Sequence, residues 1–164
     1  MKIEKISDIY EVLKGYTRKK RLVVAFANDS HSIEAVYMAV KAGLVEGILV
    51  GDTETIQGVC KENGYDESCF KIVHEPNDVR GAETAVEMIR NGEADVIMKG
   101  LVSTDKYMRA ILNKERGLVA PNAILSHVTV MECSSYHKLL TVSDVAVIPC
   151  PDLNQKISMI KYVT

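Results

Sequence analysis

The sequence has no tryptophan, only four cysteines and no long apolar run. Its 164 residues contain no C-x-x-C pair, and the four histidines show neither H-E-x-x-H nor zinc-finger spacing. We therefore expect no metal site and interpret the cysteines as thiols, mostly buried. No run approaches the roughly 18 apolar residues that a membrane-spanning helix needs, and charged residues interrupt the N-terminal segment, unlike in a signal peptide. These absences predict a protein of the reducing cytoplasm.

Positive and negative charges are nearly balanced, and aromatic residues are scarce. The chain has 20 Lys and Arg against 22 Asp and Glu, a net charge of -2, with seven Tyr and two Phe. This composition does not favour nucleic acid or an acidic membrane as a partner, so we expect small-molecule partners. The basic run 18–21 is predicted to be a solvated face at the end of a helix, where the helix dipole favours cations.

Four short apolar runs predict a parallel sheet. Each run contains Val or Ile, is too short for a helix and carries at most one charge, as strands buried on both faces do. Their starts lie 23 to 25 residues apart, which leaves room for one strand, one helix and two short loops. The runs are Leu22–Ala27, Gly47–Val50, Phe70–Val73 and Ala94–Met98.

Apolar residues at helical spacing fill the segments around these strands. We expect a helix before the first strand, over Ile3–Leu13, and a weaker one over Thr53–Asn63. A third helix covers Ile33–Leu44, and a fourth covers Val79–Ile89 with Asn77 or Asp78 as its N-cap. The chain is thus predicted to be an α/β protein with a mainly parallel sheet.

The pattern changes after Pro121. Residues 124–131 and 138–148 predict another pair of strands, which allows antiparallel pairing near the C-terminus. A last helix follows Pro151, with Ile157 and Ile160 expected on its inner side. Because the chain stops two residues beyond Tyr162, we expect it to be part of a longer protein.

Polar residues follow the fourth and first predicted strands. Lys99 and Gly100 end the fourth apolar run, and Ser103 and Thr104 then open a helix. The first N–H groups of a helix lack partners within the helix and carry partial positive charge, so a lysine and two hydroxyls beside them predict a phosphate site. Ligands of open parallel sheets bind at the carboxyl ends of the strands. The loop with Asn28, Asp29 and Ser30 lies there too, either as the cap of the next helix or as a ligand contact.

Three other polar residues allow more than one interpretation. Arg109 lies further along the same helix, where it can reach the anion, reach a neighbouring subunit or remain an ordinary exposed arginine. Arg80, near the start of a predicted helix, is interpreted as an ordinary exposed arginine. His127 beside Ser126 does not predict a base and nucleophile, because neighbours on a strand point to opposite faces.

Several segments occur together along the chain in a family-specific order: Met98–Thr104, Arg109–Glu115, Leu125–Val128, Tyr136–Leu140, and then Asp144 and Pro151–Leu153. With these segments, the chain resembles the phosphate acetyl/butyryl transferases, and most closely the phosphate butyryltransferase branch. The resemblance extends over essentially the whole chain. It implies a three-layer αβα fold of the isocitrate/isopropylmalate dehydrogenase-like type, with residues 1–120 as a phosphate and coenzyme A domain and residues 121–164 as the incomplete start of the second domain.

The resemblance also implies an activity. The family transfers an acyl group between coenzyme A and inorganic phosphate in a cleft between two domains of a dimer, without metal and without a tightly bound cofactor. The predicted site with Lys99, Gly100, Ser103 and Thr104 suits the binding of these anionic substrates, and similar family members place an arginine on the helix after this loop, where Arg109 lies. The family's catalytic loop with Ser, Arg and Asp belongs to the C-terminal half, so no catalytic residue is identified here. The partners implied are acyl-CoA, phosphate and a second copy or a C-terminal-half partner. The alternative is a non-catalytic binding or assembly module with the same fold.

Overall fold

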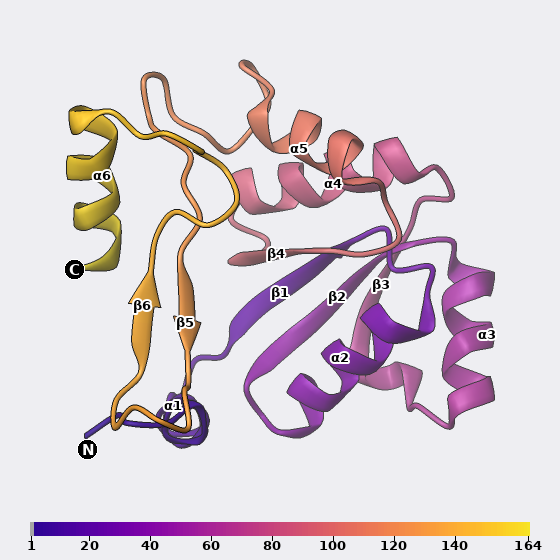
Figure 1. Ribbon diagram of the computed structural model, residues 1–164. Coiled ribbons are helices and arrows are strands. Elements are labelled where there is room, and N and C mark those ends of the chain that lie inside the picture. The colour runs from indigo at the N-terminus through magenta and orange to yellow at the C-terminus, as the bar shows by residue number, and fades with distance from the viewer. Residues whose placement is uncertain (1) are drawn as a thin grey trace. The chain divides into compact units, whose positions relative to one another are not determined.

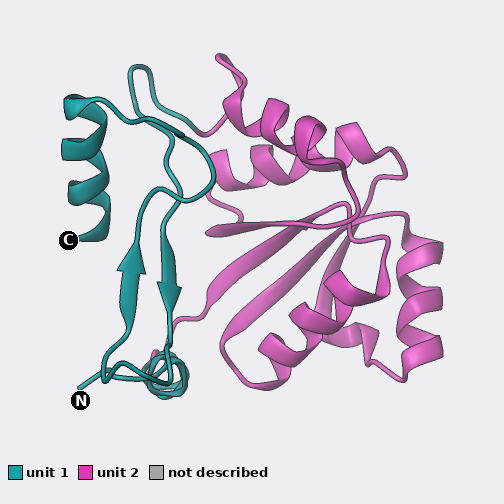
Figure 2. Cartoon of the chain, in the orientation of Figure 1, with its two compact units in different colours: residues 1–15, 119–164 teal, residues 16–118 magenta. Residues whose placement is uncertain are grey.

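The structure is a computed structural model that describes residues 2–164 in two compact units (Figure 2). Unit 2 comprises residues 16–118, and unit 1 comprises residues 1–15 and 119–164. The predicted division of the chain into a domain of residues 1–120 and the start of a second domain at residues 121–164 stays a prediction.

Unit 2 is built on a parallel sheet of four strands, as the spacing of the apolar runs predicts. The strands are β1 (Lys20–Ala25), β2 (Val45–Gly51), β3 (Phe70–His74) and β4 (Val96–Lys99). Their order in the sheet is β3-β2-β1-β4, with every neighbouring pair parallel. The chain therefore moves outward from β1 to β3 and then returns to the other side of β1. This reversal creates a topological switch point between β1 and β4.

Helices cover both faces of this sheet (Figure 1). Helices α2 (Ser30–Lys41) and α3 (Thr53–Asn63) pack on one face, where Val24 and Leu49 meet Ile33. Helices α4 (Asp78–Arg90) and α5 (Thr104–Leu112) pack on the other, where Val23 and Val50 meet helix side chains. Successive strand residues thus alternate between two apolar cores, which confirms the predicted α/β layers.

Helix boundaries follow the capping residues. Each helix of the sheet begins after a side chain that accepts a hydrogen bond from a backbone N–H of the first turn: Asp29, Asp52, Asn77 and Ser103. Asn77 is therefore the cap of α4, rather than Asp78. Leu44 and Val79 do not face inward from these helices as predicted. Helix α2 ends at Lys41, before Leu44, and Val79 is exposed. A short 3-10 helix, η1 (Glu67–Cys69), precedes β3.

The basic run 18–21 does not stand at a helix end, which corrects the prediction. Helix α1 (Ile6–Lys14) ends earlier, and Lys20 and Arg21 already belong to β1. The Arg21 Nε donates to Asp95 Oδ2 at 2.9 Å, and the Arg21 backbone N–H donates to the same oxygen at 2.9 Å. These hydrogen bonds hold the pKa of Asp95 well below its usual range. Arg21 therefore ties β1 to the start of β4 rather than forming part of a solvated face.

Unit 1 contains α1, a small antiparallel hairpin and α6 (Leu153–Val163). The hairpin strands β5 (Thr129–Met131) and β6 (Leu140–Val142) are shorter than the predicted segments. Asp144 follows β6 and accepts hydrogen bonds from the backbone N–H groups of Ala146 and Val147, each at 2.8 Å. Although desolvation opposes ionisation of Asp144, these bonds outweigh it and lower its pKa to about 2.

The inner face of α6 differs from the prediction. Met159 is its buried residue, whereas Ile157 and Ile160 are 42% and 60% exposed, and Leu153 is 72% exposed. The Tyr162 hydroxyl donates to the Ile124 carbonyl at 2.8 Å and holds α6 against residue 124 within unit 1. An apolar stripe of α6 is therefore left uncovered among the described residues.

The cysteines also differ from the prediction. All four are free thiols, as expected, but Cys60 is buried, Cys69 and Cys133 are half-buried, and Cys150 is exposed. Within residues 2–164, no cluster of three potential metal ligands is found. None of the helices in this range is both long and apolar enough to cross a membrane.

Candidate functional site

The switch point brings the two predicted ligand loops to the same place in unit 2. Ala25, the last residue of β1, is paired in register with Lys99, the last residue of β4. Beyond them, the chain leads from β1 through residues 26–29 to α2 on one face, and from β4 through residues 100–103 to α5 on the other. Because the two loops diverge from adjacent strand ends, they border the position where open α/β sheets bind their ligands.

Lys99 provides a free cation at this position. Its side chain is exposed, and within residues 2–164 it forms no ion pair. By the alternation of β4, Lys99 shares a face with Ile97, which packs against the core below α4 and α5. Lys99 therefore stands on the same side of the sheet as the start of α5.

Ser103 and Thr104 open α5, as the sequence predicts. The Ser103 hydroxyl oxygen accepts the Lys106 backbone N–H at 3.3 Å and caps the helix. A hydroxyl that accepts one hydrogen bond keeps its own hydrogen to donate, so the cap is compatible with an anion contact. Thr104 is exposed at the first helical position. Lys106 itself is engaged, since its Nζ lies 2.6 Å from Asp78 Oδ2 and lowers the pKa of Asp78.

Asn28 and Asp29 have structural roles that favour the capping interpretation. Asp29 Oδ1 accepts the Ser32 backbone N–H at 2.8 Å, and Asn28 Oδ1 accepts the Asp52 backbone N–H at 2.9 Å. The other Asp29 oxygen is buried and, among the described residues, has no hydrogen-bond partner. A carboxylate repels phosphate and accepts only from N–H or O–H groups, so this loop is less suited to phosphate than the β4–α5 loop. Ser30 is exposed, and its contact with a ligand stays a prediction.

The two arginines behave differently from each other. Arg109 is 80% exposed and lies 3.1 Å from Asp105 Oδ2, one turn earlier in α5. Its role in binding an anion stays a prediction. Arg80 is 72% exposed, as predicted, and in addition its Nε lies 3.1 Å from the carboxylate of Glu75, which is buried. Arg80 therefore neutralises a buried charge, a role that the sequence does not reveal.

Ser126 and His127 lie just before β5 rather than within a strand, which corrects the basis of the prediction, and their side chains contact different residues. The Ser126 hydroxyl donates to Asp144 Oδ2 at 3.1 Å, and the His127 ring contacts the Thr129 hydroxyl at 3.2 Å. Sequence reasoning missed His74 at the end of β3. Its Nδ1 accepts the Thr53 backbone N–H at 3.3 Å, which leaves its other ring nitrogen for solvent.

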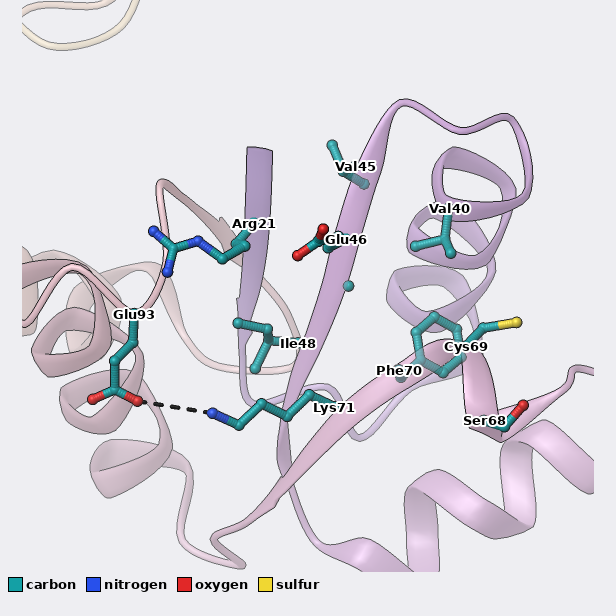
Figure 3. Close-up of a pocket in the computed structure, with 11 residues that line it drawn as sticks. Arg21, Val40, Val45, Glu46, Ile48, Ser68, Cys69, Phe70, Lys71 and Glu93 are labelled. Carbon is teal, nitrogen blue, oxygen red and sulfur yellow. Dashed lines mark ion pairs between the residues drawn. The ribbon is translucent and has the colours of Figure 1, made fainter. Parts of the chain in front are cut away.

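A hollow of unit 2 lies at the amino ends of the strands, away from the switch point (Figure 3). It has a volume of about 560 Å³, with Phe70 and Val40 among its apolar walls. Its charges are largely satisfied within the protein, because Lys71 Nζ lies 3.8 Å from Glu93 and Arg21 pairs with Asp95. We therefore place the candidate site at the carboxyl edge of the sheet.

Comparison with known proteins identifies the family. The family model "Phosphate acetyl/butaryl transferase" matches residues 75–162, more than half of the chain, and the chain belongs to this family. It is 40% identical over 158 residues to the phosphate butyryltransferase of Clostridium acetobutylicum, covering 96% of this chain and 52% of that protein. It is 33% identical over 157 residues to the phosphate acetyltransferase of Thermotoga maritima, covering 96% and 52% respectively. The chain spans about half the length of the curated relatives it matches.

Solved structures support the fold. A branched-chain phosphotransacylase from Enterococcus faecalis aligns with a TM-score of 0.69 at 22% identity, over 87% of this chain and 49% of that one. A phosphotransacetylase from Staphylococcus aureus aligns with a TM-score of 0.70 at 13% identity, over 93% of this chain and 54% of that one. At these identities the likeness shows a shared fold.

Proposed function

We propose that the chain takes part in the transfer of an acetyl- or butyryl-type acyl group between coenzyme A and inorganic phosphate, as a cytoplasmic enzyme without a tightly bound cofactor. In this reaction a phosphate oxygen attacks the thioester carbonyl carbon, the carbon–sulfur bond breaks, and the products are acyl phosphate and coenzyme A. Family membership supports the reaction class. The observation that carries the proposal is the cation of Lys99, which forms no ion pair within residues 2–164 and lies beside the start of α5 at the switch point.

The geometry suits the binding part of this chemistry. Both substrates are anionic, so the site has to hold negative groups close together before they react. Holding two reactants in place can lower the barrier by about 7 to 11 kcal/mol. In the proposal, Lys99 and the hydroxyls of Ser103 and Thr104 bind an oxyanionic group, while Gly100 lets the loop approach the strand end closely. Arg109 is proposed to reach the same ligand by exchanging its exposed contact with Asp105.

Substitution of Lys99 tests this site. Lys99→Ala is expected to weaken coenzyme A binding about tenfold in isothermal titration, because a charge-assisted hydrogen bond is removed. Lys61→Ala is the matched control, since Lys61 is an exposed lysine in the last turn of α3, at the end of that helix away from the carboxyl edge. Equal affinities of the wild type and Lys99→Ala would contradict the proposed site.

The apolar stripe of α6 favours a second candidate function, a binding or assembly module. Leu153, Ile157 and Ile160 recur at helical spacing and are all exposed. Exposed apolar patches commonly mark interaction sites. The proposed occupant is a second copy of the chain or a polypeptide equivalent to the unmatched half of the relatives.

Light scattering after size exclusion tests this assembly. The wild-type chain is expected to elute above its monomer mass of 18.1 kDa, or to shift when the partner polypeptide is added, and Ile160→Glu is expected to abolish either effect. Met38→Glu, which changes an exposed apolar residue of α2, serves as the control. A wild-type monomer unaffected by the partner would remove this candidate.

A further inference from the structure

Phe26 has an unusual backbone conformation at the switch point. It directly follows β1 and has a φ of 63°, in the left-handed region that residues with a side chain rarely adopt. Such conformations persist only where the surrounding structure holds them, and they cluster at functional sites. The contacts of Phe26 therefore indicate which part of the site its conformation serves.

The Phe26 carbonyl holds the β4–α5 loop. Its oxygen accepts the Leu101 backbone N–H at 2.7 Å, and the preceding carbonyl, of Ala25, accepts the Gly100 N–H at 3.0 Å. A side chain at Gly100 would collide with the same Phe26 carbonyl. The left-handed turn thus presents the carbonyl to the loop that carries Lys99 and Ser103 at its two ends.

The Phe26 ring is seated on α4. The nearest atoms to a Cβ added at Gly81 would be Phe26 Cδ2 at 3.2 Å and Phe26 Cβ at 3.5 Å. Gly81 is buried in the first turns of α4, where a glycine otherwise weakens a helix. Because Gly81 has no side chain, the Phe26 ring can pack directly against α4. Phe26 therefore contacts α4 through its ring and the β4–α5 loop through its carbonyl oxygen.

From these contacts we propose that Phe26, seated on Gly81, is a positioning residue that fixes the β4–α5 loop for ligand binding. Its effect on the ligand rests on the proposed function, whereas its effect on the loop does not. Phe26 touches no reacting group in this proposal. It acts through the Leu101 amide and thereby sets the separation of Lys99 from Ser103.

Amide hydrogen exchange followed by NMR tests the proposal on the full chain. Phe26→Ala and Gly81→Ala are each expected to speed exchange of the Leu101 amide about tenfold relative to the Leu49 amide in the centre of the sheet. A general loss of stability would accelerate both amides together. Gly58→Ala is the matched control, because a Cβ there meets nothing within 4 Å although Gly58 also lies in a helix.

Coenzyme A titration of the same proteins separates the two proposals. Weaker binding by Phe26→Ala and Gly81→Ala, with Gly58→Ala at the wild-type affinity, supports positioning. Unchanged relative exchange of Leu101 in both variants, or an equal increase in Gly58→Ala, overturns it. If the wild type binds no coenzyme A, the proposed function fails, and the exchange of Leu101 still decides whether Phe26 holds the loop.

Discussion

Gly100→Ala is expected to lower the free energy of unfolding by about 3 kcal/mol or more, because the added methyl group has no space. Its Cβ would lie 2.9 Å from both the Ala25 carbonyl oxygen and the Phe26 carbonyl carbon, and closer still to the Phe26 oxygen. These are backbone atoms of a strand end, so they cannot rotate away as a flexible side chain would. The β4–α5 loop has to leave its place or β1 has to shift.

Urea unfolding of Gly100→Ala beside Gly58→Ala measures this effect. Gly58→Ala is expected to stabilise the protein by about 0.5 to 1 kcal/mol, because alanine favours a helix and its Cβ meets open space. The two variants make the same chemical change, so their difference isolates the close approach at Gly100. A Gly100→Ala protein with wild-type stability would show that the two loops do not lie against each other as described.

The sheet of unit 2 was largely predictable from the sequence. Strands buried on both faces are short apolar runs, and their spacing of 23 to 25 residues leaves room for one helix between successive strands. The order β3-β2-β1-β4 was not predictable in this way. Strand order depends on which edge of the sheet the chain rejoins, and no local pattern records that choice.

Helix faces were harder to predict than helix positions. Ile157, Ile160 and Val79 have the spacing of an inner stripe, yet all three are exposed. Periodicity shows that a helix has an apolar side, but burial also requires a neighbouring element to cover it. The buried residue of α6 is Met159, which lies between the two isoleucines in sequence.

The candidate site was partly visible in the sequence. A lysine at a strand end and a capping serine are local signals, and the structure places Lys99 and Ser103 as those signals predict. The ion pairs of Arg21 with Asp95 and of Glu75 with Arg80 form between residues that no sequence motif links. The role of Phe26 depends on a backbone angle. Nothing in the sequence around Phe26 predicts its φ of 63°, so its contact with the β4–α5 loop is visible only in the structure.

Ser103→Asp separates the capping role of this residue from its proposed contact with an anion. Aspartate caps a helix about as well as serine, so the stability of the variant is expected to stay within a few tenths of a kcal/mol of the wild type. Its carboxylate, however, would stand where the ligand's negative group is proposed to bind. Two like charges about 4 Å apart near a protein surface repel by about 1 to 4 kcal/mol, so coenzyme A affinity is expected to fall on the order of a hundredfold.

The contrast with Ser103→Ala makes this result specific to charge. Alanine removes the acceptor for the Lys106 N–H, so Ser103→Ala is expected to lose about 1 kcal/mol of stability. Its affinity is expected to fall much less than that of Ser103→Asp, because only one neutral hydrogen bond to the ligand disappears. If an anion binds here, thermal unfolding shows Ser103→Asp to be more stable than Ser103→Ala. Isothermal titration then shows Ser103→Asp to bind coenzyme A more weakly than Ser103→Ala. If Ser103→Asp kept the wild-type affinity, the start of α5 would be a helix cap and not a binding site.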